Sequence, residues 1–186
     1  MNRGLFYYSM IPLLLLAALL QSTTVVKLAV RGVKPDVVLL LVLVGTLLYG
    51  SKPGIGWAFV GGLALDSFSG GPLGSSSLAL MMAATLAGVG HRLLSRFNPL
   101  VPLGICALGT LLYGILYVLL INAQTEVAIW LKGQNLLIEA PYELRLPLWS
   151  SLQFIIAPAM LYNTALMLFL VPLLNRVPES QDVALG

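Results

Sequence analysis

Charged residues are scarce in this chain of 186 residues, since Asp, Glu, Lys and Arg together make up only 9% of it, against about a quarter in ordinary globular domains. Histidine and cysteine each occur once, as His91 and Cys106. One cysteine excludes an intrachain disulfide, and no His, Cys or carboxylate cluster has the spacing of a metal site. We therefore expect no structural disulfide, no metal and no cofactor.

The sequence also lacks the parts of a nucleophilic enzyme, which needs a nucleophile, a base and an orienting group within hydrogen-bond reach. The run Gly74-Ser75-Ser76-Ser77-Leu78 begins like a nucleophile elbow, but Leu78 stands where the final glycine belongs. His91 lies more than three turns away if the segment is helical, and is better explained as an interfacial anchor. We therefore expect no enzyme activity.

Apolar residues are abundant: they form 59% of the chain, and the mean hydropathy is +0.95. Spans of about 20 residues each would use most of the length, which predicts one integral membrane domain over residues 1–186. The net charge of +3 comes from basic residues scattered in ones and twos. Such charges set topology and contact lipid headgroups, so we expect a bilayer and no nucleic acid.

Six apolar segments follow from charges and Gly/Pro punctuation, and the predicted fold is an all-α polytopic membrane bundle with spans at about 5–26, 35–49, 54–66, 74–90, 100–121 and 151–174. The first segment follows a basic residue and has a signal peptide as its alternative, but no good cleavage pattern follows it. The segment 54–66 is short and rich in glycine, so re-entry is the alternative to a full crossing.

The one long connection, residues 122–150, mixes apolar with charged side chains. Its Val127, Ile129, Trp130 and Leu131 predict a short helix lying in the membrane interface. The polar tail 175–186 is expected to fray.

Small residues recur at spacings of four, which places them on single helix faces. One set is Ala58 and Gly62, and the other is Ala79, Ala83 and Ala87. Such faces allow close backbone packing in lipid. Internal packing is the favoured interpretation, and docking of another protein's span is the alternative.

Two acids stand beside apolar segments, Asp36 near the start of the second and Asp66 near the end of the third. Consecutive spans run in opposite directions, so both acids are expected at one membrane face. An ionised side chain there is costly unless it is paired. We expect Lys34 or backbone N–H groups of the 67–74 turn to hold them, and expect the turn 69–74 to pack against other helices. The alternative for each acid is a solvated carboxylate that caps a turn.

Two stretches carry a resemblance to a known family. They are Lys34-Pro35-Asp36, which opens the second segment, and Gly61-Gly62-Leu63-Ala64-Leu65-Asp66, which runs on into Ser67-Phe68-Ser69-Gly70-Gly71-Pro72-Leu73-Gly74. They resemble the bacterial rod shape-determining protein MreD family. That family has a basic residue, Pro and Asp or Asn at the second span, and Leu-x-x-Asp-x-x-Ser-Gly-x-x-Leu-Gly at the end of the third. Asp66, Ser69, Gly70, Leu73 and Gly74 fill the second pattern.

The resemblance implies a non-enzymatic, six-span protein of the inner membrane, with a fold like the substrate-binding (S) subunit of energy-coupling-factor transporters. It implies MreC as a partner and, through MreC, the peptidoglycan synthesis machinery of PBP2, RodA and MreB filaments. Basic residues divide evenly between the two sides, so the resemblance alone places both termini in the cytoplasm.

A second function class remains open, a vitamin-binding subunit of an energy-coupling-factor transporter. It rests on fold analogy alone. Such a subunit needs several converging polar groups, and the outer segment ends offer few beyond Asp36 and Asp66. A cavity there filled by aliphatic side chains would favour the scaffold.

Overall fold

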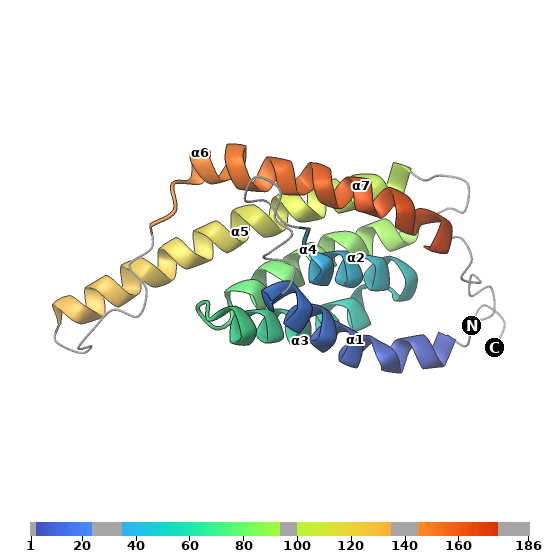
Figure 1. Cartoon of the computed structure of the whole chain (residues 1–186), viewed down its shortest axis with the longest axis horizontal. Helices are drawn as coiled ribbons and strands as arrows, with labels where there is room; N and C mark the ends of the chain where they lie inside the picture. The colour runs from blue at the N-terminus through green and yellow to red at the C-terminus, as the bar shows by residue number, and fades with distance from the viewer. Residues whose placement is uncertain (1–2, 24–34, 94–99, 135–144, 175–186) are drawn as a thin grey trace.

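A computed structural model describes residues 3–23, 35–93, 100–134 and 145–174, and every regular element in these ranges is a helix (Figure 1). The elements are α1 (Arg3–Thr23), α2 (Val37–Tyr49), α3 (Ser51–Ser69), α4 (Ser75–Leu93), α5 (Leu100–Gly133), α6 (Leu148–Ser151), a π-helical turn (Leu152–Ile156) and α7 (Ala157–Leu174). The last three run on without a break, so these ranges form six helices, as predicted. Lys34 and the tail 175–186 lie outside the described residues.

The central helix is α2, the most apolar segment of the bundle. It contacts α1, α3, α4, α5 and α7, and its residues from Val38 to Leu48 are buried apart from Leu41, which is partly buried. A helix that is apolar on every side is stable only when neighbours surround it. The hydroxyl of its buried Thr46 donates to the carbonyl of Val42 at 2.7 Å. The core of the protein therefore forms around α2.

The closest helix pair is α3 and α4, which meet through small residues. A Cβ at Gly62 would overlap the backbone of Ser77 and lie 2.8 Å from the carbonyl carbon of Ser76. Ala58 is fully buried, and so is the predicted alanine face of α4, formed by Ala79, Ala83 and Ala87. Both small-residue faces therefore pack inside the bundle, as the favoured interpretation has it, and neither is free to receive another protein's span.

The fifth helix corrects the predicted boundary near residue 121. It continues as one helix of 34 residues to Gly133, about 51 Å at the usual rise. The stretch 122–132 holds no Gly or Pro that would end a helix, so the backbone continues although the hydropathy falls. Exposed Val127 and Trp130 therefore belong to α5 and not to a separate interfacial helix, and Figure 1 shows this end of α5 extending beyond its neighbours.

The third segment is also longer than predicted, because α3 covers residues 51–69 as one uninterrupted helix of 19 residues. Its length of about 28 Å approaches the thickness of about 30 Å of a bilayer's hydrocarbon core. By length and composition, two helices of the described chain are long and apolar enough to cross a membrane, Leu100–Gly133 and the helix Leu148–Pro172. Crossing by the other segments stays a prediction.

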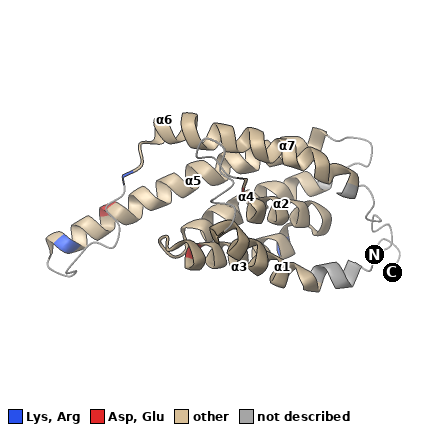
Figure 2. Cartoon of the chain, in the orientation of Figure 1, with Lys and Arg blue, Asp and Glu red and all other residues tan. Residues whose placement is uncertain are grey.

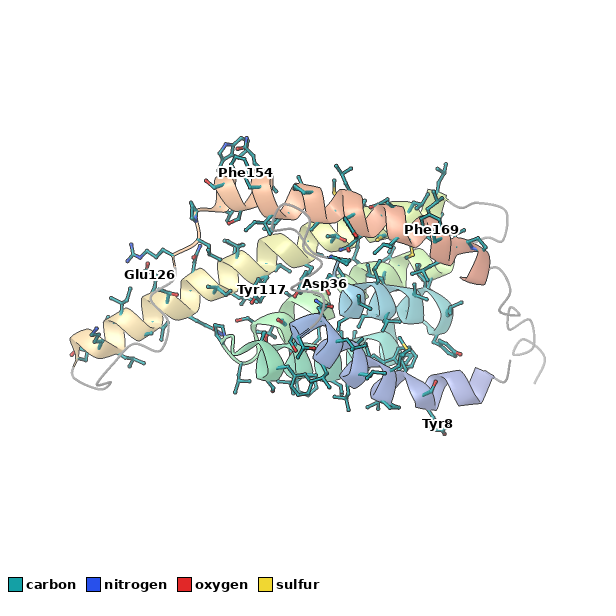
Figure 3. The ribbon with its side chains drawn as sticks, in the orientation of Figure 1. Tyr8, Asp36, Tyr117, Glu126, Phe154 and Phe169 are labelled. Carbon is teal, nitrogen blue, oxygen red and sulfur yellow. The ribbon has the colours of Figure 1, made fainter. Side chains whose placement is uncertain are left out.

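Apolar side chains cover the outside of the bundle as well as its core. Figure 3 shows Phe154 and Phe169 pointing away from the bundle, and both are strongly exposed. Large exposed apolar surfaces of this kind are typical of contact with a membrane or with other proteins. Figure 2 shows that charged residues of the described chain are few and that some lie on or beside the projecting end of α5. Glu126 and Lys132 belong to this part of α5, and Arg145 Nη2 lies 3.0 Å from Glu126 Oε1.

Candidate functional site

Asp66 caps the start of α4 from the end of α3. Its side chain is 1% exposed, and its carboxylate accepts hydrogen bonds from the backbone N–H groups of Gly74, at 2.7 Å, and Ser76, at 3.2 Å. The first N–H groups of a helix have no partner within the helix, and a carboxylate there also gains from the helix dipole. The prediction that turn N–H donors hold Asp66 is therefore confirmed, and the carboxylate is buried instead of solvated.

Glycines shape the turn that brings Asp66 to α4. Gly70 ends α3 at φ +67°, and Gly74 precedes α4 at φ +93°, both in the left-handed region that favours glycine. These two residues are the glycines of the motif Ser69-Gly70 and Leu73-Gly74, so the motif encodes a turn geometry. The hydroxyl of Ser69 donates back to the carbonyl of Leu65 at 2.6 Å.

The expectation that the 69–74 turn packs against other helices is wrong for half of it. Ser69, Gly70 and Leu73 are exposed, Leu73 at 69%, whereas Gly71, Pro72 and Gly74 are partly buried. The N–H groups of Gly74 and Ser76 each need an acceptor, and the Asp66 carboxylate supplies it. Neighbouring helices are therefore not required to satisfy these two donors.

Asp36 is the N-cap of α2, with its carboxylate accepting from the N–H of Leu39 at 3.0 Å. Pro35 therefore lies directly before the cap of this helix. The amide of Gln21 on α1 completes this end: its Oε1 accepts from the N–H of Val38, and its Nε2 donates to Asp36 Oδ1, both at 3.1 Å. Two side chains from different helices thus serve the start of α2.

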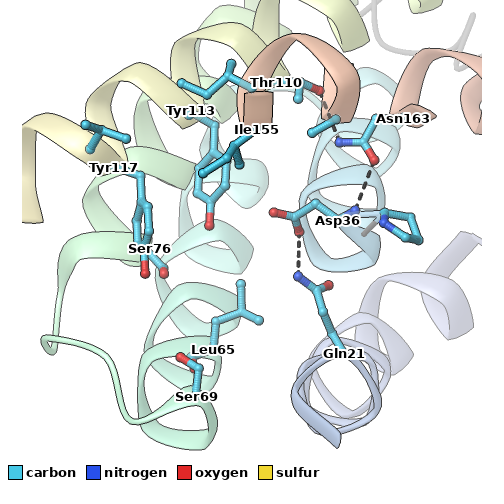
Figure 4. Close-up of a pocket in the computed structure, with 15 residues that line it drawn as sticks. Gln21, Asp36, Leu65, Ser69, Ser76, Thr110, Tyr113, Tyr117, Ile155 and Asn163 are labelled. Carbon is cyan, nitrogen blue, oxygen red and sulfur yellow. Dashed lines mark hydrogen bonds between the residues drawn. The ribbon is translucent and has the colours of Figure 1, made fainter. Parts of the chain in front are cut away.

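A buried amide on α7 joins the same junction. Asn163 is fully buried, its Oδ1 accepts from the backbone N–H of Asp36 at 3.0 Å, and its Nδ2 donates to Thr110 Oγ1 of α5 at 3.4 Å. Figure 4 shows this chain of contacts from Gln21 through Asp36 to Asn163 and Thr110. Four helices are therefore tied together by polar side chains at one end of the bundle.

A cavity of about 270 Å³ lies beside this junction, between it and the α3–α4 turn. Asp36 and Ser76 line it, together with Tyr113 and Tyr117 of α5, whose rings stack at 5.9 Å with an angle of 24° between their planes. Because Ser76 donates to Asp66, both acids belong to one end of the bundle, as predicted. The expectation of few polar groups is wrong, since tyrosine, serine, threonine and amide side chains converge here.

Sequence reasoning missed Gln21, Thr110, Asn163 and the two tyrosines of this site. A signal was available, because polar residues inside apolar helices usually face the interior of a bundle and pair there. Asn163 is the one amide among the mostly apolar residues of α7, and Gln21 follows the apolar run of α1. The bonds from Gly74 and Ser76 also explain how Asp66 is tolerated in a buried position.

Within the four described ranges, no group of three or more His, Cys, Asp or Glu side chains could hold a metal ion. Ser76 and His91 lie at opposite ends of α4, about 22 Å apart along the helix axis. The ring Nδ1 of His91 lies 2.6 Å from the carbonyl oxygen of Leu47. Hydroxyls, amides and carboxylates in this region hold helices together and line a cavity.

An all-helical protein with an apolar exterior, whose polar residues cap and join its helices, belongs to the class of integral membrane proteins. The sequence model of one family, described as rod shape-determining protein MreD, matches residues 2–177. The chain therefore belongs to the MreD family, which confirms the resemblance and implies a role in rod shape determination. No curated protein and no solved structure matches the chain, so the likeness to transporter S subunits stays a prediction.

Proposed function

We propose that this chain is a non-enzymatic scaffold of the bacterial cell-elongation complex, which binds MreC and through it helps to position peptidoglycan synthesis by PBP2 and RodA along MreB filaments. The observation that carries the proposal is the family match over residues 2–177, nearly the whole chain. The structure is compatible with it, because Asp36, Asp66 and Asn163 bond to other parts of the same bundle.

The scaffold sits in the inner membrane as a multi-pass protein with both termini in the cytoplasm. An even number of consecutive helices supports this, since it returns the chain to its starting side. Figure 1 agrees in drawing the first turn of α1 and the last turn of α7 at the same end of the bundle. The cavity and the projecting end of α5 then face outward, toward the part of MreC outside the cytoplasm.

The partner's span docks on the outer surface of α3 and α4, around Gly56. A Cβ added there would meet no atom of the described chain within 4 Å, so nothing in the bundle uses the small size of Gly56. Glycine inside a helix costs about 0.5–1 kcal/mol relative to alanine. A second helix that packs closely against the glycine would offset this cost.

The surface beside Gly56 is apolar and continuous. Phe59 is 49% exposed and Leu78 is 52% exposed, and the two helices are joined there because Ser77 Oγ donates to the carbonyl of Phe59 at 3.2 Å. Met82, one turn further along α4, is also exposed. A single apolar helix of the kind expected for MreC fits such a surface.

The test is a pair of glycine substitutions. Gly56→Leu and Gly104→Leu both place a side chain in open space, so both variants should fold with wild-type yield. We expect Gly56→Leu to abolish capture of co-expressed, tagged MreC in mild detergent, and Gly104→Leu to retain it. Capture by both variants would contradict this docking surface, and absence of capture by the wild-type chain would contradict the scaffold itself.

A vitamin-binding transporter subunit remains the second candidate, and one observation favours it: the cavity contains several polar groups. Its volume of about 270 Å³ lies just below the range of about 300–1,000 Å³ usual for ligand pockets. This function requires a water-soluble ligand that co-purifies with the chain and is released on denaturation. The scaffold requires instead that depletion of the protein makes rod-shaped cells round.

A further inference from the structure

The lining of the cavity at the polar end combines polar and apolar side chains. Asp36, Ser76 and the two tyrosines are among the polar ones, and Val118, Ile155 and Ile156 are among the apolar ones. Figure 4 shows Ile155 beside Tyr113, whose ring reaches down into the same space as the Asp36 carboxylate. A molecule that fills this space must therefore contact both polar groups and apolar side chains.

Most polar side chains around the cavity are already bonded within the chain. The amide of Gln21 bonds to α2, Asn163 bonds to Asp36 and Thr110, and the hydroxyls of Thr110 and Ser69 donate to backbone carbonyls one turn earlier. The hydroxyls of Tyr113 and Tyr117 sit at the tips of long side chains that point into the cavity (Figure 4), and both interact with the side chain of Ser76. A hydroxyl can donate one hydrogen bond and accept others, so these hydroxyls can still hydrogen-bond an occupant.

The charges around the cavity limit the kind of ligand that it can bind. Among the described residues that line the cavity none is Lys or Arg, whereas Asp36 is one of them, and Asp66 lies just behind Ser76. A phosphate or carboxylate in this space would face two acids without a cation from that lining, which is strongly unfavourable at low dielectric. An uncharged hydroxyl can both donate to and accept from tyrosine and serine hydroxyls.

The apolar part of this lining reaches the outside of the bundle. Ile155 is 53% exposed although it lines the cavity, and the neighbouring Phe154 points outward (Figure 3). Ile155 and Ile156 belong to the π-helical turn, whose wider backbone precedes Pro158, a residue that cannot donate to the carbonyl of Phe154. Access from the side of the bundle, between α5 and the π-helical turn, suits a ligand that arrives from the bilayer.

The volume of the cavity limits the size of the ligand that it can hold. The cavity has the volume of roughly nine water molecules at about 30 Å³ each, which suits a glycerol-sized head and a few carbons of a chain. The rest of a long chain would lie outside, along the exposed side chains of the last helix. The geometry points to a binding site for a single uncharged lipid that carries free hydroxyls, with its head against Tyr113, Tyr117 and Ser76 and its chain leaving past Ile155.

The test uses the purified full chain in detergent, with 1-monooleoylglycerol as the probe and native mass spectrometry as the readout. Oleate, which has the same chain and an anionic head, and glycerol, which has the head alone, are the comparison ligands. We expect saturable binding of one monooleoylglycerol, with oleate and glycerol each at least ten-fold weaker. Since no partner protein is present, this result does not depend on the scaffold function.

Two variants locate the site. Tyr117→Phe keeps the ring and removes one hydroxyl, which should weaken binding about five-fold, the effect of one average hydrogen bond. Ala159→Leu fills the cavity and should abolish binding, with folding checked by thermal unfolding. Tyr162→Phe is the matched control, because Tyr162 lies on the same helix as Ala159 but outside the cavity, and it should bind like the wild type.

Several results would overturn the assignment. They are absence of saturable binding, equal binding of oleate, equal binding of glycerol, or wild-type binding by both Tyr117→Phe and Ala159→Leu. Equal binding of glycerol would show that the site takes a water-soluble polyol instead of a lipid.

Discussion

Replacement of Asp66 tests the polar end of the bundle most directly. Asp66→Leu removes the acceptor of two N–H groups, those of partly exposed Gly74 and buried Ser76, and leaves the donor of Ser76 without water. An unsatisfied buried donor costs about 1–3 kcal/mol and the donor of Gly74 adds less, so the loss should be about 2–4 kcal/mol. Asp66→Asn keeps one acceptor oxygen and should cost only about 1–3 kcal/mol. The larger figure is a substantial part of the usual total stability of about 5–15 kcal/mol.

The assay is unfolding in detergent micelles by added sodium dodecyl sulfate, followed by tryptophan fluorescence. Trp57 is a suitable reporter, because it lies on α3 in the core and packs edge-on against Tyr49 with ring centroids 5.6 Å apart. Trp130 and Trp149 are exposed and should change less. The expected order of midpoints is wild type, then Asn, then Leu, with exposed Ser67→Ala as a control at the wild-type midpoint. Equal midpoints for all four proteins would refute the capping role.

Three further predictions concern packing, the network and topology. Gly62→Ala should destabilise the bundle by about 1–3 kcal/mol, because the methyl overlaps the backbone of α4, whereas Gly56→Ala should be neutral or stabilising. The same unfolding assay compares the two variants, and equal midpoints would contradict the close packing of α3 against α4. Asn163→Ala should lower the free energy of unfolding by about 1–3 kcal/mol, because the N–H of Asp36 loses its acceptor. A wild-type midpoint in the same assay would show that the network is not needed. In a variant lacking Cys106, a single cysteine at position 135 should react with an impermeant reagent in intact cells and one at position 94 should not; the reverse pattern would invert the proposed topology.

Local chemistry made much of this structure predictable from the sequence. The acid after Pro35 is a helix cap, the acid before the glycine-rich turn accepts from that turn, and the small residues at spacings of four are buried. Each depends on residues within about ten positions of one another, where spacing and residue type nearly determine the geometry. The family resemblance rested on these same local patterns.

The features that sequence reasoning missed depend on other physics. Hydropathy indicates where a segment leaves an apolar environment, so the charges after Ile121 predict the end of a helix. The α5 backbone nevertheless continues to Gly133, because no Gly or Pro interrupts it over residues 122–132. The contact between Asp36 and Asn163 joins residues 127 positions apart, and no local pattern specifies which buried amide meets which cap. The cavity lies beside that junction and depends on the same distant contacts, so local sequence patterns could not predict it either.

The cap that Asp66 gives to α4 has a consequence for the order in which the bundle assembles. Gly74 and Ser76 lie only eight and ten residues after the acid, so the loop that this contact closes is short and its entropic cost is small. Segments with such local contacts form quickly, before distant elements meet. The pair α3–α4 should therefore enter the bilayer as a helical hairpin with its turn already satisfied. The junction at Asn163 cannot form until the last helix has been made, so the polar end is completed only when synthesis is nearly finished.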